Sequence, residues 1–125
     1  MPLAVTWRAS LFGAVASTAA YSASIDWLDG LLITLDQNRK LLSNLLESKL
    51  PQVKYRIPDF GYLAWLDMSA LGLGDDPAAK ILEKGKVALN GGVLYGPKHK
   101  SFVRLNFGTS PEIITEAFDR LANCL

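Results

Sequence analysis

The segment Ser101–Gly108, which reads SFVRLNFG, alternates strictly between two sets of side chains. Neighbouring side chains of a β-strand point to opposite faces of the sheet. One face therefore carries Val103, Leu105 and Phe107, and the other carries Phe102, Arg104 and Asn106. A strand with one apolar face must pack against other elements, so the chain is predicted to build a sheet with helices on that face.

Capping residues and hydrophobic spacing predict the other elements. Helices are expected from about Leu3 to Tyr21, from Ser24 to about Ser48, from Asp76 to Lys84 with Gly85 as its closing residue, and from Ser110 onward. Further strands are expected over residues 53–57, 62–67 and 87–89, the last followed by a turn at 90–92. The predicted fold class is α+β: a small, mainly antiparallel sheet of three or four short strands, covered by helices on one face, with a long N-terminal helical pair.

Composition limits the classes of function. The chain has 125 residues, of which 50% are hydrophobic, and a formal net charge of +1, which indicates one small globular domain. It lacks the basic stripe of a nucleic-acid-binding protein and the run of about 18 apolar residues of a membrane span, so neither partner is expected. The one cysteine, Cys124, cannot form an internal disulfide or a metal cluster. That usage agrees with a reducing cytoplasm.

Few residues are candidates for chemistry. His99 lies between two lysines and is expected to be an exposed loop residue, while Asp75 and Asp76 precede a helix and are expected to cap it. Arg104 remains. Its guanidinium either extends to water or closes a pocket that receives an anion, because its planar set of donors matches a carboxylate. Asn106 faces the same way.

Several segments together resemble a known family. YLAWLD (residues 62–67), ILEKGKVAL (81–89), GGVLYG (91–96) and FVRLNFG (102–108) are similar to the C-terminal small domain of fold-type I aminotransferases, which depend on pyridoxal 5'-phosphate (PLP). Within that class the chain most resembles the cystathionine β-lyase, or C–S lyase, branch. Residues 19–67 resemble the long interdomain helix, the second helix and the entry into the small domain.

The resemblance implies roles for individual residues. In such enzymes the arginine at the position of Arg104 binds the α-carboxylate of the amino-acid substrate, and Tyr95 and Asn106 are weaker candidates for the same site. A C–S lyase of this kind releases pyruvate, ammonia and a thiol from L-cystathionine or cysteine conjugates. The alternatives are the small domain of an aminotransferase, which would share Arg104, and a non-catalytic interaction module that retained the fold.

The resemblance also implies that residues 1–125 are a fragment, with an interdomain-type helix over 1–22 and the small domain over 23–125. No lysine of the sequence lies in the motif that binds PLP covalently, so the fragment alone is expected to bind no cofactor and to be inactive. Its expected partners are the large PLP-binding domain and an amino-acid substrate. Apolar residues of the first helix are expected to be exposed and to promote a homo-oligomer: Trp7, Leu11, Phe12 and Val15.

Overall fold

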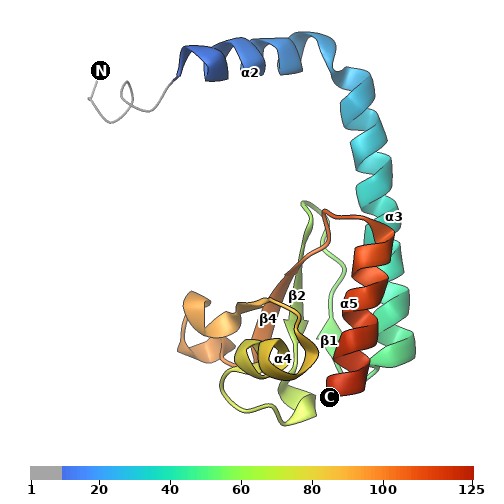
Figure 1. Cartoon of the computed structure of the whole chain (residues 1–125), viewed down its shortest axis with the longest axis vertical. Coiled ribbons are helices and arrows are strands. Elements are labelled where there is room, and N and C mark those ends of the chain that lie inside the picture. The colour runs from blue at the N-terminus through green and yellow to red at the C-terminus, as the bar shows by residue number, and fades with distance from the viewer. Residues whose placement is uncertain (1–9) are drawn as a thin grey trace. The chain divides into compact units, whose positions relative to one another are not determined.

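The computed structural model describes residues 10–125. Its chain divides into a first unit, Met1–Thr34, and a second unit, Leu35–Leu125, which are described separately. The first unit contains α2 (Leu11–Ala23) and the beginning of α3 (Ile25–Lys49). The rest of α3 and all later elements belong to the second unit. The elements are labelled in Figure 1, whose colours follow the residue number.

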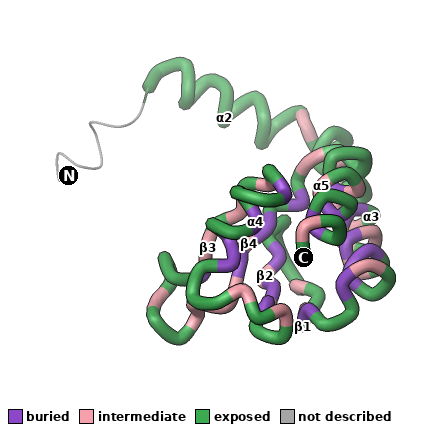
Figure 2. Tube along the Cα trace, turned by 60° about the horizontal axis from the view of Figure 1, so that its bottom comes forward, coloured by how far each residue is buried: buried purple, intermediate pink, exposed green. Residues whose placement is uncertain are grey.

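The helices predicted in the first unit are present, although the expected start near Leu3 and the residue Trp7 lie outside the described residues. Ser10 caps α2, since its hydroxyl accepts a hydrogen bond of 2.9 Å from the backbone N–H of Gly13. Every residue of α2 is exposed (Figure 2). The exposed side chains include Leu11, Phe12, Val15 and Tyr21 of α2 and Ile25, Trp27 and Leu32 of α3.

The second unit contains a four-stranded antiparallel sheet in the order β1-β2-β4-β3. Its strands are β1 (Lys54–Tyr55), β2 (Leu63–Asp67), β3 (Asn90–Gly91) and β4 (Phe102–Asn106). In the register of the sheet, Arg104 of β4 lies opposite Trp65 of β2 on one side and opposite Asn90 of β3 on the other. The α+β class and the antiparallel sheet are therefore confirmed.

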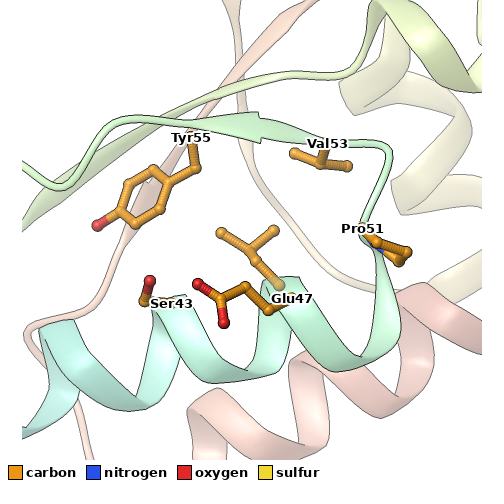
Figure 3. Close-up of a pocket in the computed structure, with 6 residues that line it drawn as sticks. Ser43, Glu47, Pro51, Val53 and Tyr55 are labelled. Carbon is orange, nitrogen blue, oxygen red and sulfur yellow. The ribbon is translucent and has the colours of Figure 1, made fainter.

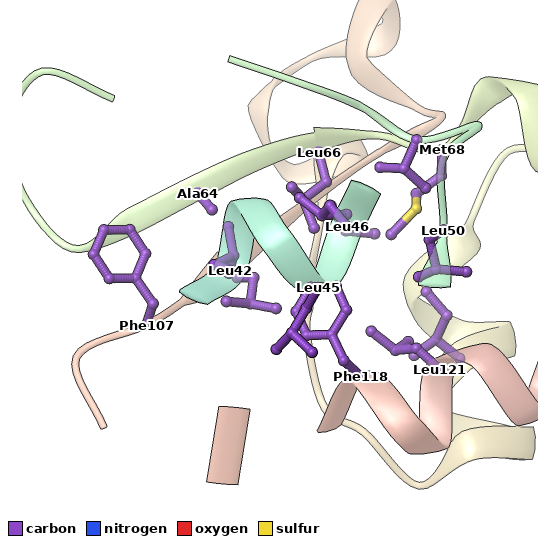
Figure 4. Close-up of a cluster of buried hydrophobic side chains, with 14 of the residues drawn as sticks. Leu42, Leu45, Leu46, Leu50, Ala64, Leu66, Met68, Phe107, Phe118 and Leu121 are labelled. Carbon is purple, nitrogen blue, oxygen red and sulfur yellow. The ribbon is translucent and has the colours of Figure 1, made fainter. Parts of the chain in front are cut away.

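The apolar face of the sheet is covered by three helices: the second part of α3, α4 (Pro77–Gly85) and α5 (Pro111–Cys124). The alternation predicted for β4 is confirmed, because Val103, Leu105 and Phe107 are buried. They join a core whose other members come mostly from these helices and from β2, among them Leu42, Leu46, Leu66, Phe118 and Leu121 (Figure 4). The opposite face of β2 and β4 is free to carry polar residues.

Asn38 is the one polar side chain that the described residues bury in this core, at 1% exposure. Its amide nitrogen donates hydrogen bonds to the carbonyl oxygens of Phe107 (3.0 Å) and Thr109 (2.7 Å). Buried carbonyl groups need such partners. Asn38 therefore ties α3 to the chain that leaves β4.

Two local predictions were wrong. Residues 87–89 are not a strand; the chain pairs with β4 only at Asn90 and Gly91, which were expected to be a turn. Gly85 does not close α4 with a left-handed conformation, since Lys86 does so with φ 55°. Gly85 instead allows close packing, because a Cβ there would lie 2.8 Å from Sγ of Cys124.

Helix starts and short connections follow the predicted capping. Asp76 accepts a hydrogen bond from the N–H of Ala79 (3.1 Å), and Ser110 accepts one from the N–H of Ile113 (3.4 Å). Three 3₁₀ helices complete the structure: η1 (Ser69–Leu71), η2 (Gly92–Tyr95) and η3 (Pro97–His99). Across residues 10–125, none of the helices combines the length and the apolar character needed to cross a membrane.

Candidate functional site

Arg104 lies in the middle of β4 on the face opposite the core. Its Nη2 donates a hydrogen bond of 2.9 Å to Oδ1 of Asn90, and its Cζ lies 5.5 Å from the centre of the Tyr95 ring. A guanidinium over an aromatic face is attracted by the ring electrons. Two uncharged groups thus hold the guanidinium, one from β3 and one from η2.

The charge of Arg104 is not neutralised by the described part of the chain. Three other arginines pair with carboxylates: Arg39 with Asp36, Arg56 with Asp59, and Arg120 with Glu116. Arg104 forms no such ion pair with any residue from 10 to 125. It therefore keeps its full positive charge and most of its donors for an anion.

A cluster of aromatic rings packs beside Arg104. Trp65 stacks on Phe102 with ring centres 5.4 Å apart, and the rings of Tyr95 and Trp65 are nearly perpendicular with centres 5.2 Å apart. His99 was predicted to be an exposed loop residue, but it is half-buried. Its ring packs against those of Trp65 and Phe102, with ring centres 5.7 Å apart in both pairs. This packing fixes the ring of Tyr95 beside the guanidinium of Arg104.

Gly92 allows η2 to approach β4. A Cβ at position 92 would lie 2.0 Å from the carbonyl oxygen of His99 and 2.8 Å from that of Phe102, so only glycine fits. The buried backbone of Gly92 is thus pressed between η3 and the start of β4. Tyr95, three residues later, is held next to Arg104 as a result.

The structure brings together two of the three predicted site residues, Arg104 and Tyr95. Asn106 shares the face of β4 that carries Arg104, but its Oδ1 accepts a hydrogen bond of 2.8 Å from the N–H of Gly108 and not from Arg104. A role for Asn106 in substrate binding remains a prediction. Asn90 was missed, because its segment was predicted to be a turn and its pairing with the strand that carries Arg104 is not visible in the sequence.

Comparisons with known proteins show the family relationship of the chain. No family model matches the chain. The cystathionine β-lyase PatB of Bacillus subtilis is 40% identical over 115 residues, which are 91% of this chain and 30% of PatB. This chain is a homologue of the cystathionine β-lyases. The family resemblance seen in the sequence is therefore confirmed.

Solved structures of PLP-dependent enzymes also resemble this cystathionine β-lyase homologue. A proposed PLP-dependent β-cystathionase of Corynebacterium diphtheriae superposes with a TM-score of 0.87 and 35% identity, over 93% of this chain and 31% of that one. Cystalysin of Treponema denticola, whose crystal structure contains PLP, gives a TM-score of 0.85 and 26% identity over 92% of this chain and 29% of its own. The chain spans about a third of the length of its relatives.

The described residues do not by themselves fit PLP. All eight lysines between Lys40 and Lys100 are exposed or half-buried, and three of them pair with carboxylates: Lys40 with Asp36, Lys49 with Asp119 and Lys100 with Asp75. The aspartates and glutamates of residues 10–125 are likewise exposed or half-buried, so no buried acid is available for a pyridine nitrogen. Within the same residues, no group of His, Cys, Asp and Glu is arranged to bind a metal ion.

A separate cavity lies between α3 and β1 in the second unit. It measures about 190 Å³ and is lined by Ser43, Leu46, Glu47, Pro51, Val53 and Tyr55 (Figure 3). The hydroxyl of Tyr55 is buried and has no hydrogen-bond partner among residues 10–125. Burial raises the pKa of the Tyr55 phenol, an effect that the charge of Arg39 partly opposes.

Replacing Tyr55 with phenylalanine should make stability less sensitive to high pH. The unfolded chain releases the Tyr55 proton near pH 10, while the folded chain, with its raised pKa, retains it. Stability from this group is therefore intact below pH 10 and decreases as pH rises through the folded-state pKa. Urea midpoints at pH 7 and pH 10.5 measure this loss.

Tyr21→Phe is the matched control, because Tyr21 is 89% exposed. The loss of stability between the two pH values should be smaller in Tyr55→Phe than in the parent chain and unchanged in Tyr21→Phe. Equal losses in all three proteins would contradict the burial of the Tyr55 hydroxyl.

Proposed function

We propose that this chain is the substrate-binding small domain of a PLP-dependent C–S lyase. The complete enzyme would release pyruvate, ammonia and a thiol from L-cystathionine or cysteine conjugates. The observation that carries the proposal is the guanidinium of Arg104, which keeps its charge while Asn90 and Tyr95 hold it in place. The relatives named cystathionine β-lyase, including PatB, support the reaction class.

Arg104 would bind the α-carboxylate of the amino-acid substrate. Two parallel N–H···O bonds from a guanidinium fix the plane of a carboxylate as well as its position. This contact would restrict rotation of the substrate and direct its Cα–H bond toward the reacting centre. It would also discriminate against amines that lack a carboxylate, because the donors of Arg104 would then have no acceptor on the substrate.

The bound cofactor would supply the electron sink for the carbanion formed at Cα. The residues that hold it would come from a large domain outside this chain, since the described lysines and carboxylates do not fit PLP. The isolated chain would accordingly bind no PLP and show no turnover. We place the enzyme in the cytoplasm, in agreement with the one free cysteine, Cys124.

The exposed apolar side chains of the first unit would be covered by the large domain and by a second copy of the protein. Leu11, Phe12 and Trp27 are 78%, 87% and 69% exposed. Apolar surface of this kind promotes association. Light scattering of the chain over a concentration series should therefore give a mass above that of one copy, and a strict monomer would count against this part of the proposal.

The reaction is tested in the complete enzyme with L-cystathionine. Release of pyruvate and a thiol would support the lyase. Exchange of the amino group with a keto acid, without thiol release, would identify an aminotransferase that uses the same arginine. Absence of both reactions in a PLP-loaded protein would favour a non-catalytic interaction module and overturn the proposal.

A further inference from the structure

Asn90 is placed next to Arg104 by the sheet itself. The two residues are direct partners in the antiparallel pairing of β3 with β4, so their side chains leave the sheet on the same face. The 2.9 Å bond from Nη2 of Arg104 to Oδ1 of Asn90 spans this pair. Because both Cα positions are set by the ladder, the bond restricts the direction of the guanidinium.

The acceptor at position 90 is uncharged, and this has a chemical consequence. A guanidinium has five N–H donors, of which Asn90 uses one. An amide oxygen orients the group while leaving its positive charge intact. A carboxylate at the same position would form an ion pair with Arg104 and compete with any incoming anion.

The neighbouring acids are engaged elsewhere. Asp67 of β2 shares the open face of the sheet, but its Oδ1 accepts a hydrogen bond of 2.9 Å from the N–H of Ser69. Asp76 caps α4, and Asp75 pairs with Lys100 at 2.7 Å. Within residues 10–125, the guanidinium of Arg104 thus has one hydrogen bond, to the uncharged Asn90, and one cation–π contact, with the ring of Tyr95.

We propose that Asn90 is a positioning residue that orients Arg104 for the substrate carboxylate without neutralising it. The inference rests on the proposed function of Arg104 and adds a determinant of substrate affinity. The inference predicts an unusual order of substitutions at position 90. Aspartate is nearly isosteric with asparagine and could accept the same hydrogen bond, yet it should be a worse replacement than alanine.

The test is steady-state kinetics of the complete PLP-loaded enzyme with L-cystathionine. Asn90→Ala should raise KM about fivefold, because the guanidinium loses its restraint, while Asn90→Asp should raise KM by about 30-fold or more, because an ion pair occupies Arg104. The kcat should change much less than KM in both variants. The control is Asn44→Asp, which adds the same charge at an exposed position of α3 and should leave KM unchanged.

A purely structural role for Asn90 predicts the reverse order, with alanine more harmful than aspartate, and that order would overturn the inference. Should Asn90→Ala fail to fold, the KM of Asn90→Asp against that of Asn44→Asp decides, and equal values would contradict the inference.

A double-mutant cycle separates this inference from the proposed function. In an Arg104→Ala background, Asn90→Asp should add less than a twofold change in KM, because the group it would neutralise is gone. If Arg104→Ala itself leaves KM unchanged, the proposed carboxylate site fails and the inference with it. If Arg104→Ala raises KM while the Asn90 variants behave like Asn44→Asp, the positioning role alone is wrong.

Discussion

Arg104→Ala in the complete enzyme should lower kcat/KM for amino-acid substrates by a factor between about 30 and several thousand. This range corresponds to roughly 2–5 kcal/mol, the usual cost of removing one partner of a desolvated, hydrogen-bonded charge pair. The loss is expected because no other described arginine could replace Arg104. Each of the other three, Arg39, Arg56 and Arg120, pairs with a carboxylate. Steady-state kinetics with L-cystathionine measures it.

Two companion variants sharpen this result. Arg104→Lys should fall between the parent enzyme and Arg104→Ala, since an ammonium keeps the charge but not the planar set of donors. Arg120→Ala removes an exposed arginine of α5 that pairs with Glu116, and it should leave kcat/KM unchanged. Equal kinetics for Arg104→Ala and Arg120→Ala would show that Arg104 has no role in binding substrate.

Gly92→Ala should reduce the free energy of unfolding of the chain by about 3 kcal/mol or more. The added Cβ would meet the carbonyl oxygen of His99 at 2.0 Å, and a contact with backbone cannot be relieved by rotating a side chain. Either η2 and η3 would move away from β4 or the strand would distort. Urea denaturation followed by tryptophan fluorescence measures the change, because Trp65 lies beside the affected loop.

The control for Gly92→Ala is Gly30→Ala in α3. A Cβ at position 30 meets nothing within 4 Å, and alanine favours the helix, so this variant should be neutral or up to about 1 kcal/mol more stable. An unfolding midpoint of Gly92→Ala equal to that of the parent chain would contradict the close approach of η2 to β4.

Predictions succeeded where one short pattern determines the structure. The alternation of residues 101–108 was enough to divide β4 into a buried face and an open one, because pleating of a strand depends on no distant contact. The start of α4 at Pro77 and that of α5 at Pro111 also followed from local capping by Asp76 and Ser110. These features required no knowledge of the rest of the fold.

Predictions failed where distant residues decide the conformation. The apolar residues 87–89 suggested a strand, but the ladder partners of Arg104 and Val103 are Asn90 and Gly91. Strand propensity cannot show where an edge strand meets its neighbour, because register depends on both strands. Gly85 was expected to close the helix, whereas its lack of a side chain makes room for Cys124 of α5.

Two asparagines, one in the core and one beside Arg104, illustrate the same limit. Asn38 and Asn90 appeared as ordinary polar residues of a helix and a turn, and their roles became visible only with their partners, 69 and 14 residues away along the chain. The strand pattern was enough to single out Arg104. It did not show whether the guanidinium extends to water or closes a pocket. The family resemblance suggested the pocket, and the pairing of Arg104 with uncharged groups supports it.

The most direct test of the central claim is a crystal structure of the complete enzyme with a non-reactive amino-acid analogue bound. We expect both oxygens of its α-carboxylate to lie about 2.7–2.9 Å from guanidinium nitrogens of Arg104, while Asn90 keeps its bond to Nη2. A carboxylate bound by other residues, with the guanidinium of Arg104 directed into solvent, would contradict it.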